Sequence, residues 1–275
     1  MNKLKFFSNQ KMPWIKVIIL AVASAVITAV LNLIPALHNT SFQDIAVNLE
    51  CWILFAVFII VNCRKWWEAS LKTFVFFLLS QPLIYLIQVP FSSIRFGLFN
   101  YYKYWFIVTV LTLPGAAIAY QVKRKDWLAT AVLSVATGFL GYSTATYFWR
   151  TKADFPYHLI SMCFCVILAL FLIFALLDKK SHRLASVLVV VIAAAITLYV
   201  FKPTTEQAIT LDEGSWTYVI EDPEIADVEI KDDNSVVFSA KSKGTSLVTF
   251  TNENGEITEY YVTVSGGSII ATPFD

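Results

Sequence analysis

Long apolar stretches follow one another through the first three quarters of the chain. Each approaches or exceeds the roughly 20 helical residues that cross a 30 Å hydrocarbon core. They run without the alternation of apolar and polar residues that marks a membrane β-barrel, which favours helices. The sequence therefore predicts a polytopic helical bundle with about seven transmembrane helices. The expected spans are Trp14–Leu37, Ile45–Asn62, Leu71–Phe91, Tyr104–Val122, Trp127–Phe148, Tyr157–Leu177 and Leu184–Phe201.

The pattern changes after Lys202-Pro203, where short segments rich in β-branched and aromatic residues begin. Asn254-Gly255 between two such segments indicates a hairpin with a type I′ turn. We expect a helical domain over residues 1–203 and a compact β-sandwich over 204–275. The tail from Ser265 onwards is either flexible or an added edge strand. The expected strands are Ala208–Leu211, Trp216–Ile220, Ala226–Ile230, Ser235–Ala240, Ser246–Thr251 and Thr258–Val264.

Charge is divided between these two parts. The chain is 57% hydrophobic and 15% charged, with a mean hydropathy of +0.63, which is typical of membrane proteins. Its net charge of +1 hides 18 Lys and Arg against 6 Asp and Glu up to Pro203, and 3 Lys against 14 Asp and Glu after it. The two parts therefore lie in different environments, and the acidic part is expected to be exposed to water.

Basic residues also alternate between the connections of the expected spans. Twelve occupy the N-terminal tail and every second connection, whereas the other short connections hold four. The positive-inside rule places the twelve in the cytoplasm, so the C-terminal domain is expected outside the cell. The twelve are Lys3, Lys5, Lys11, Arg64, Lys65, Lys72, Lys123, Arg124, Lys125, Lys179, Lys180 and Arg183, and the four are Arg95, Lys103, Arg150 and Lys152.

Three segments of the C-terminal part resemble a known family. They are Asp222–Val228 (DPEIADV), Lys243–Thr249 (KGTSLVT) and the closing strand Tyr261–Val264 (YVTV). Together they resemble the bacterial immunoglobulin-like group 2 domain, over about a fifth of the chain. The chain departs from that family at Val219–Glu221, where the family often has Trp-Ser-Ser, and at Asn234, where it usually has glycine. The resemblance implies an immunoglobulin-like sandwich on a bacterial surface protein, used as a spacer, adhesive unit or partner-binding domain, and brings no catalytic residue.

The most distinctive connection is the aromatic segment, Phe91–Phe106, which holds eight aromatic residues with Arg95 and Lys103. One interpretation is a platform for sugars or lipid headgroups, because rings stack on such ligands and cations pair with phosphate. The other, which we favour, is a segment that lies in the headgroup region. The candidate ligand- or partner-binding residues here are Arg95, Tyr101, Tyr102, Lys103 and Trp105.

Helix breakers mark a second candidate region. Pro114-Gly115 is expected to interrupt the fourth span and Pro82 the third, and broken helices line substrate cavities in some transporters. Pro114 and Gly115 therefore join the candidate binding residues. Polar residues within the spans, including Gln81 and Gln88, are read mainly as hydrogen-bonding groups between helices. Ser134, Gly138 and Gly141 on the fifth span predict a close helix contact.

No catalytic, metal or cofactor site is identified. Four cysteines lie in or beside apolar runs, and Cys163 and Cys165 form a C-x-C without His or carboxylate neighbours at ligand spacing. No known nucleophile, metalloprotease or Walker motif is present. A His–carboxylate pair could still serve as a general base if outer-side groups converge. Those groups are His38, Asp44, Glu50, Arg95, Arg150, Asp154 and His158.

Four functions compete. The first is an accessory or structural subunit of the cell membrane that presents the immunoglobulin-like domain to a membrane or envelope protein. The alternative is a transporter or lipid-handling protein with a pathway near the third and fourth spans. A sensor would need a separate output protein, and an enzyme would need a histidine paired with a carboxylate. We favour the first, with the lipid bilayer and a membrane or envelope protein as partners. Nucleic acid is not expected as a partner, because the cytoplasmic loops are short and the outer domain is acidic.

Overall fold

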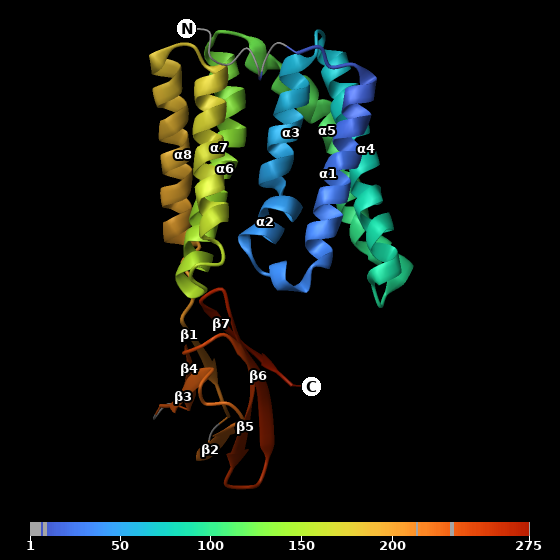
Figure 1. Ribbon diagram of the computed structural model, residues 1–275. Helices are drawn as coiled ribbons and strands as arrows, with labels where there is room; N and C mark the ends of the chain where they lie inside the picture. Colours follow the sequence, from blue (N-terminus) through green and yellow to red (C-terminus); the bar gives the residue numbers. More distant parts are fainter. Residues whose placement is uncertain (1–6, 8–9, 213, 232–233, 275) are drawn as a thin grey trace. The chain divides into compact units, whose positions relative to one another are not determined.

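The computed structural model describes residues 7, 10–212, 214–231 and 234–274 of the chain (Figure 1). The chain separates into two compact units, and each is described by itself. The helical unit comprises residues 1–147 and 157–196, and the second unit comprises 148–156 and 197–275. A helical region followed by an all-β domain is therefore confirmed.

Eight α-helices form over the described residues. They are α1 (Trp14–Leu33), α2 (Ser41–Val47), α3 (Leu49–Asn62), α4 (Trp66–Gln88), α5 (Phe99–Ala119), α6 (Trp127–Ala153), α7 (Leu159–Leu176) and α8 (Lys180–Val200). Short 3-10 helices η1 (Pro35–Leu37), η2 (Val89–Phe91), η3 (Arg95–Leu98) and η4 (Tyr120–Lys123) join them. Six of the α-helical segments are long and apolar enough to cross a membrane, or seven if α2 and α3 form one span.

The second expected span is two helices instead of one. Helices α2 and α3 meet at Asn48 with a bend of 44°. Asn48 has an extended backbone, its N–H closes α2 on the Asp44 carbonyl, and its side chain donates to the Tyr147 hydroxyl at 2.7 Å. The Asn48 side chain thus bonds to a residue of another helix at the point where the chain leaves the helical conformation. The pattern of apolar residues along the sequence does not reveal such a break.

The expected interruptions at prolines are wrong in two of the long helices. Helix α4 continues through Pro82, and α5 continues through Pro114-Gly115. A proline removes only one helical donor, and neighbouring helices hold a long apolar helix together across that gap. Pro35 behaves differently, because α1 ends at Leu33 and a 3-10 turn starts at Pro35.

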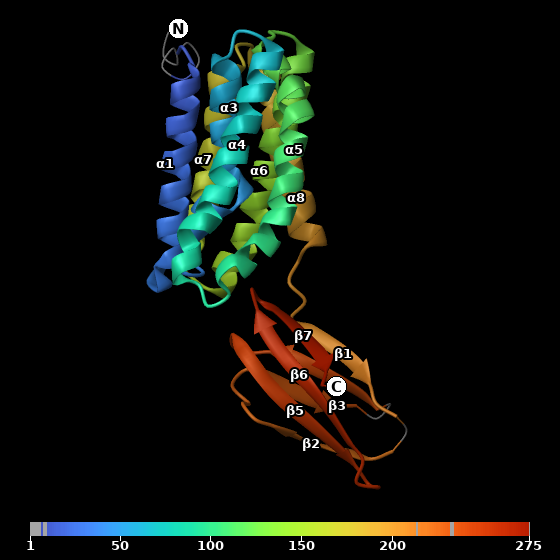
Figure 2. The same cartoon turned by 90° about the vertical axis from the view of Figure 1, so that its right-hand side faces the viewer.

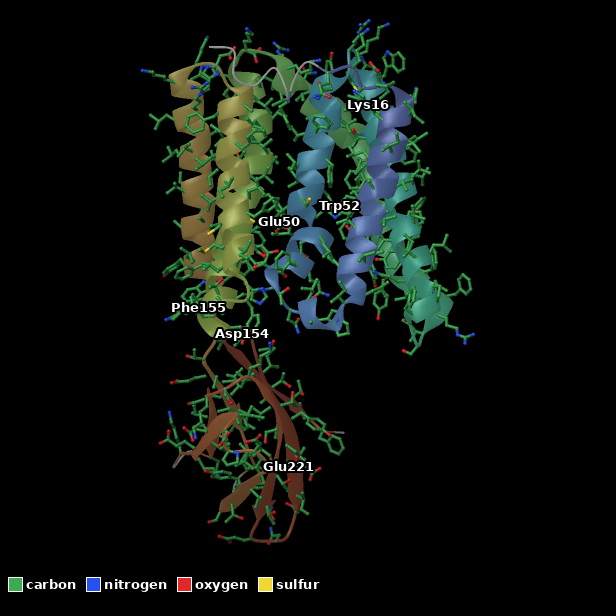
Figure 3. The ribbon with its side chains drawn as sticks, viewed as in Figure 1. Lys16, Glu50, Trp52, Asp154, Phe155 and Glu221 are labelled. Atoms are coloured by element: carbon green, nitrogen blue, oxygen red, sulfur yellow. The ribbon has the colours of Figure 1, made fainter. Side chains whose placement is uncertain are left out.

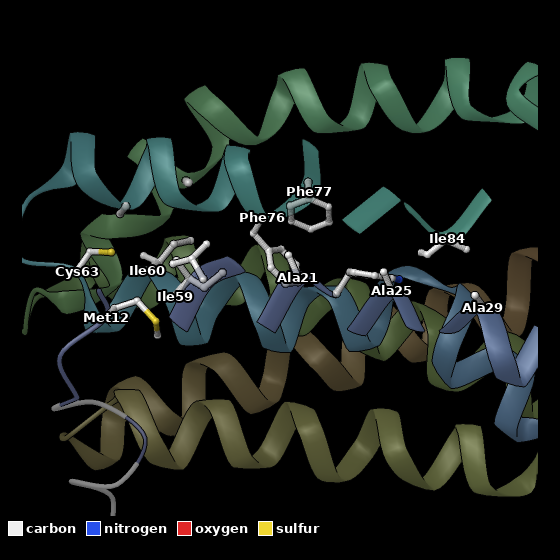
Figure 4. Packing of buried hydrophobic residues seen from close by; sticks show 14 residues of the cluster. Met12, Ala21, Ala25, Ala29, Ile59, Ile60, Cys63, Phe76, Phe77 and Ile84 are labelled. Atoms are coloured by element: carbon white, nitrogen blue, oxygen red, sulfur yellow. The ribbon is translucent and has the colours of Figure 1, made fainter. Parts of the chain in front are cut away.

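One core of the helical unit lies between α1, α3 and α4 (Figure 4). Helix α1 presents Ala21, Ala25 and Ala29, one turn apart, and all three are fully buried. Their small side chains let neighbouring helices approach closely, and the large rings of Trp52 and Phe76 fill the space beside them. This alternation of small and large side chains gives the close packing of a protein interior.

A buried lysine closes one end of this core. Lys72 of α4 donates to the Met12 carbonyl and pairs with Glu68 one turn away, and its side chain is 5% exposed. The second oxygen of Glu68 accepts from the backbone N–H of Arg64 at 2.9 Å. The sequence pattern counted Lys72 among the loop cations, but its charge lies inside α4 and ties the chain before α1 to α4.

A second core joins α3, α6, α7 and α8. Its fully buried residues include Leu140 of α6 and Leu172 and Ile173 of α7. Ser134 of α6 and Ser186 of α8 share a hydrogen bond of 2.8 Å, and Gly141 of α6 lies against the backbone of α8. The close helix contact predicted from the small residues of the fifth span is therefore confirmed.

The β domain consists of two antiparallel sheets (Figure 2). One has the order β1-β4-β3 and the other β2-β5-β6-β7. Apolar side chains from both sheets, among them Phe238, Phe250 and Val262, form one buried core. The strands are β1 (Glu206–Thr210), β2 (Trp216–Ile220), β3 (Ala226–Ile230), β4 (Ser235–Ala240), β5 (Gly244–Asn252), β6 (Ile257–Ser265) and β7 (Ser268–Pro273).

Two features of the domain had been left open or were atypical of the resembled family. The C-terminal tail forms β7, an edge strand that pairs with β6 through a turn at Gly266-Gly267, both at positive φ. Asn234, which stands where that family usually has glycine, has φ +57°. Asparagine is the side chain that best tolerates this left-handed conformation after glycine, which explains the exchange.

The β5–β6 hairpin is confirmed, but its expected type I′ turn is wrong. Only Gly255 has positive φ in this turn, and the Gly255 N–H bonds to the Asn252 carbonyl. The Asn252 side chain accepts from the N–H groups of Asn254 and Glu256, both at 2.9 Å. These bonds stabilise a longer loop in which Asn254 keeps negative φ.

Asn252→Ala is expected to lower the free energy of opening of this hairpin by about 1 kcal/mol, because two backbone N–H groups lose their side-chain acceptor and bond to water instead. Amide hydrogen exchange in the middle of β5 and β6 should then become about fivefold faster, if these amides exchange through opening of the hairpin. Thr217→Ala on the neighbouring β2 serves as a control, since only one exposed hydroxyl contact is lost. Equal exchange rates in Asn252→Ala and the unmodified protein would contradict the role given to Asn252.

Candidate functional site

A buried polar cluster joins α2 to the beginning of α7. His158, which precedes α7, places its Nδ1 2.6 Å from Oδ2 of Asp44 on α2, and both side chains are less than a tenth exposed. Ser161 donates its hydroxyl to the same Asp44 oxygen at 3.1 Å. One carboxylate thus accepts two hydrogen bonds from residues more than a hundred positions away along the chain.

The backbone reinforces this contact. The N–H and hydroxyl of Ser41 both donate to the Tyr157 carbonyl at 2.7 Å, and the Ser41 hydroxyl accepts from the Ser161 N–H at 3.1 Å. The Tyr147 ring stacks on the His158 ring with centroids 6.4 Å apart. The first turn of α2 and the first turn of α7 are therefore held together by a connected network.

Glu50 lies in the first turn of α3, next to the break at Asn48, and is 5% exposed (Figure 3). A carboxylate is stabilised at this position because the N-terminus of a helix carries a partial positive charge. Together with Asp44 it places two buried carboxylates on either side of the break, which the expected single span did not predict.

The chemistry of the cluster is that of an oriented histidine. A carboxylate on Nδ1 holds the ring as in the orienting half of a catalytic triad. The hydroxyls of Ser41 and Ser161 donate to a carbonyl and a carboxylate, so neither is activated by the ring. Within the described residues no group of three His, Cys, Asp or Glu side chains is placed to hold a metal ion. The geometry supports a tie between helices.

Two of the other outer-side groups, His38 and Arg95, have exposed surroundings. His38 bonds through Nε2 to the Asn32 carbonyl at 2.9 Å and is exposed to solvent. Arg95 begins η3, is exposed, and has φ +45°. Of the seven polar groups considered from the sequence, the hydrogen bonds bring together Asp44 and His158.

The aromatic segment is divided between exposed and half-buried positions. It is helical from Phe99 onwards, because α5 starts five residues before the expected Tyr104. Tyr101 and Lys103 are exposed. The half-buried Tyr102 contacts the rings of Tyr85, Phe99 and Phe106, and the half-buried Trp105 lines a small cavity.

Pro114 and Gly115 lie on an exposed part of α5. A Cβ built on Gly115 would have no neighbour within 4 Å. Neither residue lines the cavity near Trp105 or the apolar cavity described next. The small cavity that includes Trp105 lies nearer the start of α5.

The described residues of the helical unit enclose an apolar cavity and a smaller cavity with polar groups in its walls. An apolar cavity of about 420 Å³ lies between α1, α3 and α7, with Leu20, Leu54, Phe58 and Phe171 among its walls. A polar cavity of about 60 Å³ is bounded by α1, α2, α3, α4 and α5 and includes Gln81, Gln88 and Trp105. Sequence reasoning named both glutamines as helix-contact groups, but their convergence with Trp105 depends on how α4 packs on α5.

Comparison with known proteins gives one finding. Residues 194–265, about a quarter of the chain, match the model of a family described as the pilus formation protein N terminal region. The match begins in the last turns of α8 and includes β1 to β6. No curated protein matches the chain, and no solved structure matches it. The match covers the β domain that the immunoglobulin-like resemblance also covers, and it leaves α1 to α7 outside.

Proposed function

We propose that the chain is a multi-pass protein of a bacterial cell membrane and an accessory subunit of a pilus- or secretion-type envelope assembly. In this role the N-terminus is cytoplasmic, and the helices hold the β domain, an immunoglobulin-like sandwich, outside the cell for a protein partner. The match of residues 194–265 to a pilus formation family carries the proposal. The apolar helices and the alternation of basic residues supply the membrane and orientation arguments.

The β domain offers one surface suited to a protein partner. On the outer face of the sheet β2-β5-β6-β7, Val219 and Ile270 are more than half exposed. Tyr261 lies in the same face, and Phe274 packs edge-on against its ring at 5.1 Å. Val219 lies on one edge strand of the sheet and Ile270 on the other, with Tyr261 on a strand between them. Exposed apolar residues on one face, amid an acidic surface, are typical of protein contact sites. The partner surface is expected to be apolar at its centre and basic at its rim.

A pull-down of the full-length protein in mild detergent, with an N-terminal tag and cross-linking, tests this function. We expect a stoichiometric envelope protein whose recovery falls at least tenfold with Val219→Ser combined with Tyr261→Ser. Val237→Ser on β4 of the other sheet is the matched control and should leave recovery unchanged. A partner-free particle, or equal recovery with all variants, would contradict the accessory role.

Lipid handling is the second candidate function. The observation in its favour is the apolar cavity, whose lining of Phe, Leu and Ile side chains suits an acyl chain. These side chains include no polar group that could hold a lipid headgroup. The cavity therefore suits a specifically bound acyl chain and a bulk lipid that fills the space between helices equally well. The candidate ligand residues of the aromatic segment, with Pro114 and Gly115, remain a proposal within this second function.

A further inference from the structure

The small polar cavity beside Trp105 contains hydrogen-bonding groups that the chain does not satisfy. Gln81 and Gln88 stand seven residues apart on α4, which places them two turns apart on one face of that helix. They are 2% and 6% exposed. The Nε2 atoms of both have no hydrogen-bond partner within the part of the chain that the structure describes.

An unpaired buried amide N–H costs roughly 1–3 kcal/mol, so two in one cavity indicate partners from outside the chain. Two other polar groups of the cavity have bonds of their own. Asn32 Oδ1 accepts from Gln43 at 2.7 Å, and the Thr28 hydroxyl donates to the Ala46 carbonyl at 3.2 Å. No acceptor of the described chain bonds to the Nε2 atom of either glutamine. The missing partner must therefore supply oxygen acceptors.

The walls restrict what can supply those oxygens. None of the residues that line the cavity is charged, so an ionised group would be buried without a counter-charge. Trp105 and Tyr85 add flat apolar walls, which suit the carbon face of a hydroxylated group. The volume of about 60 Å³ holds a few water molecules or one group of about the size of glycerol.

We propose that this cavity binds the hydroxyl oxygens of an uncharged polyol of about the size of glycerol, either the glycerol part of a membrane lipid or the same polyol free in solution. Gln81 and Gln88 donate to the hydroxyl oxygens, and Trp105 covers the carbon face. A polyol carried on a lipid requires the membrane insertion that is part of the proposed function. Binding of a polyol from solution does not require it. The site extends the expected ligand region from the exposed aromatic segment to the buried face of α4.

Native mass spectrometry of the full-length protein in phosphatidylcholine nanodiscs tests the proposal, with monoolein, whose glycerol keeps two free hydroxyls, as the probe. We expect monoolein to stay bound after the nanodisc is stripped, and phosphatidylcholine to be lost. Recovery of folded protein in the nanodisc reports membrane insertion separately from lipid retention. Competition by free glycerol would assign the site to the polyol alone, and its absence would assign it to the polyol carried on a lipid.

Gln81→Met and Gln88→Met remove the donors while keeping the length of the side chain, and each should lower retention of monoolein about tenfold. Gln121→Met in η4 is the matched control and should retain monoolein like the unmodified protein. Equal retention of monoolein and phosphatidylcholine by the unmodified protein would overturn the proposal even if a variant fails to fold. Unchanged retention in both methionine variants would overturn it as well.

Discussion

Asp44→Ala is expected to destabilise the helical unit by about 3–5 kcal/mol, because removing one member of a buried pair leaves the polar group of the other unsatisfied. His158 and Ser161 both lose the acceptor that they share, and both residues are less than a tenth exposed. The Ser161 hydroxyl keeps only a long contact of 3.4 Å with the Ser41 carbonyl, and Nδ1 of His158 loses its bond to the carboxylate. In mild detergent the thermal midpoint should fall by about 10 °C.

The control is an exposed aspartate that pairs with a lysine. Asp178 lies 3.3 Å from Lys125, and both side chains are more than two thirds exposed. Asp178→Ala should cost less than about 1 kcal/mol, since water screens such pairs. A double-mutant cycle between Asp44→Ala and His158→Ala should show coupling of at least about 1 kcal/mol. Additive effects would mean that the two residues stabilise the protein separately.

Gly141→Ala is expected to destabilise the contact of α6 with α8 by about 2–3 kcal/mol. A Cβ at this position would lie 2.5 Å from the carbonyl oxygen of Val190 and 3.2 Å from its Cα. Those are backbone atoms of a neighbouring helix, so relief requires the helices to separate. This cost exceeds the roughly 1 kcal/mol that alanine gains over glycine inside a helix.

Gly138→Ala is the matched control one turn earlier on the same helix. Its Cβ would lie 3.3 Å from Cγ1 of Val189, a side-chain atom that can turn away. The gain in helix propensity should then leave the protein equally stable or slightly more stable. Thermal unfolding of both variants in the same detergent gives the comparison. Equal midpoints would show that α6 and α8 do not pack as closely as the backbone contact implies.

The cluster at Asp44 and the cavity at Gln81 illustrate two uses of buried polar groups. In the first, a carboxylate, an imidazole and two hydroxyls satisfy one another and connect helices. In the second, two amide donors of residues that line a small cavity have no hydrogen-bond partner among the described residues. A satisfied network stabilises a fold, whereas unsatisfied donors in a cavity indicate a ligand.

The long helices could be predicted from the sequence because each must satisfy its own backbone polar groups over an apolar stretch, which is a local requirement. The strands could be predicted because alternation and turn residues are also local, and six of the seven segments were expected. The breaks were predicted less well. Pro82 and Pro114 leave their helices continuous, while Asn48 ends one, since packing partners decide whether a lost hydrogen bond is replaced.

The candidate sites depended on residues far apart along the chain. His158 and Asp44 were among the polar groups that could converge, yet nothing in their spacing distinguished them from His38 or Arg95. Trp105 was selected for its aromatic neighbours, whereas its cavity is made with two glutamines of another helix. The sequence did not single out Ser41, Ser161 or Tyr147. A hydroxyl group on an apolar helix cannot be assigned a role before its hydrogen-bond partner is known.

The sequence by itself determined a helical region of long apolar segments, an acidic β domain after it, and the alternation of basic residues between connections. These properties depend on composition and short-range pattern, where each residue contributes independently. Only the tertiary structure decided that Asp44 meets His158, that Gly141 must remain glycine, and that Gln81 and Gln88 share a cavity with Trp105. Such contacts depend on which faces of distant helices pack together, and the free energy of that packing is distributed over the whole unit.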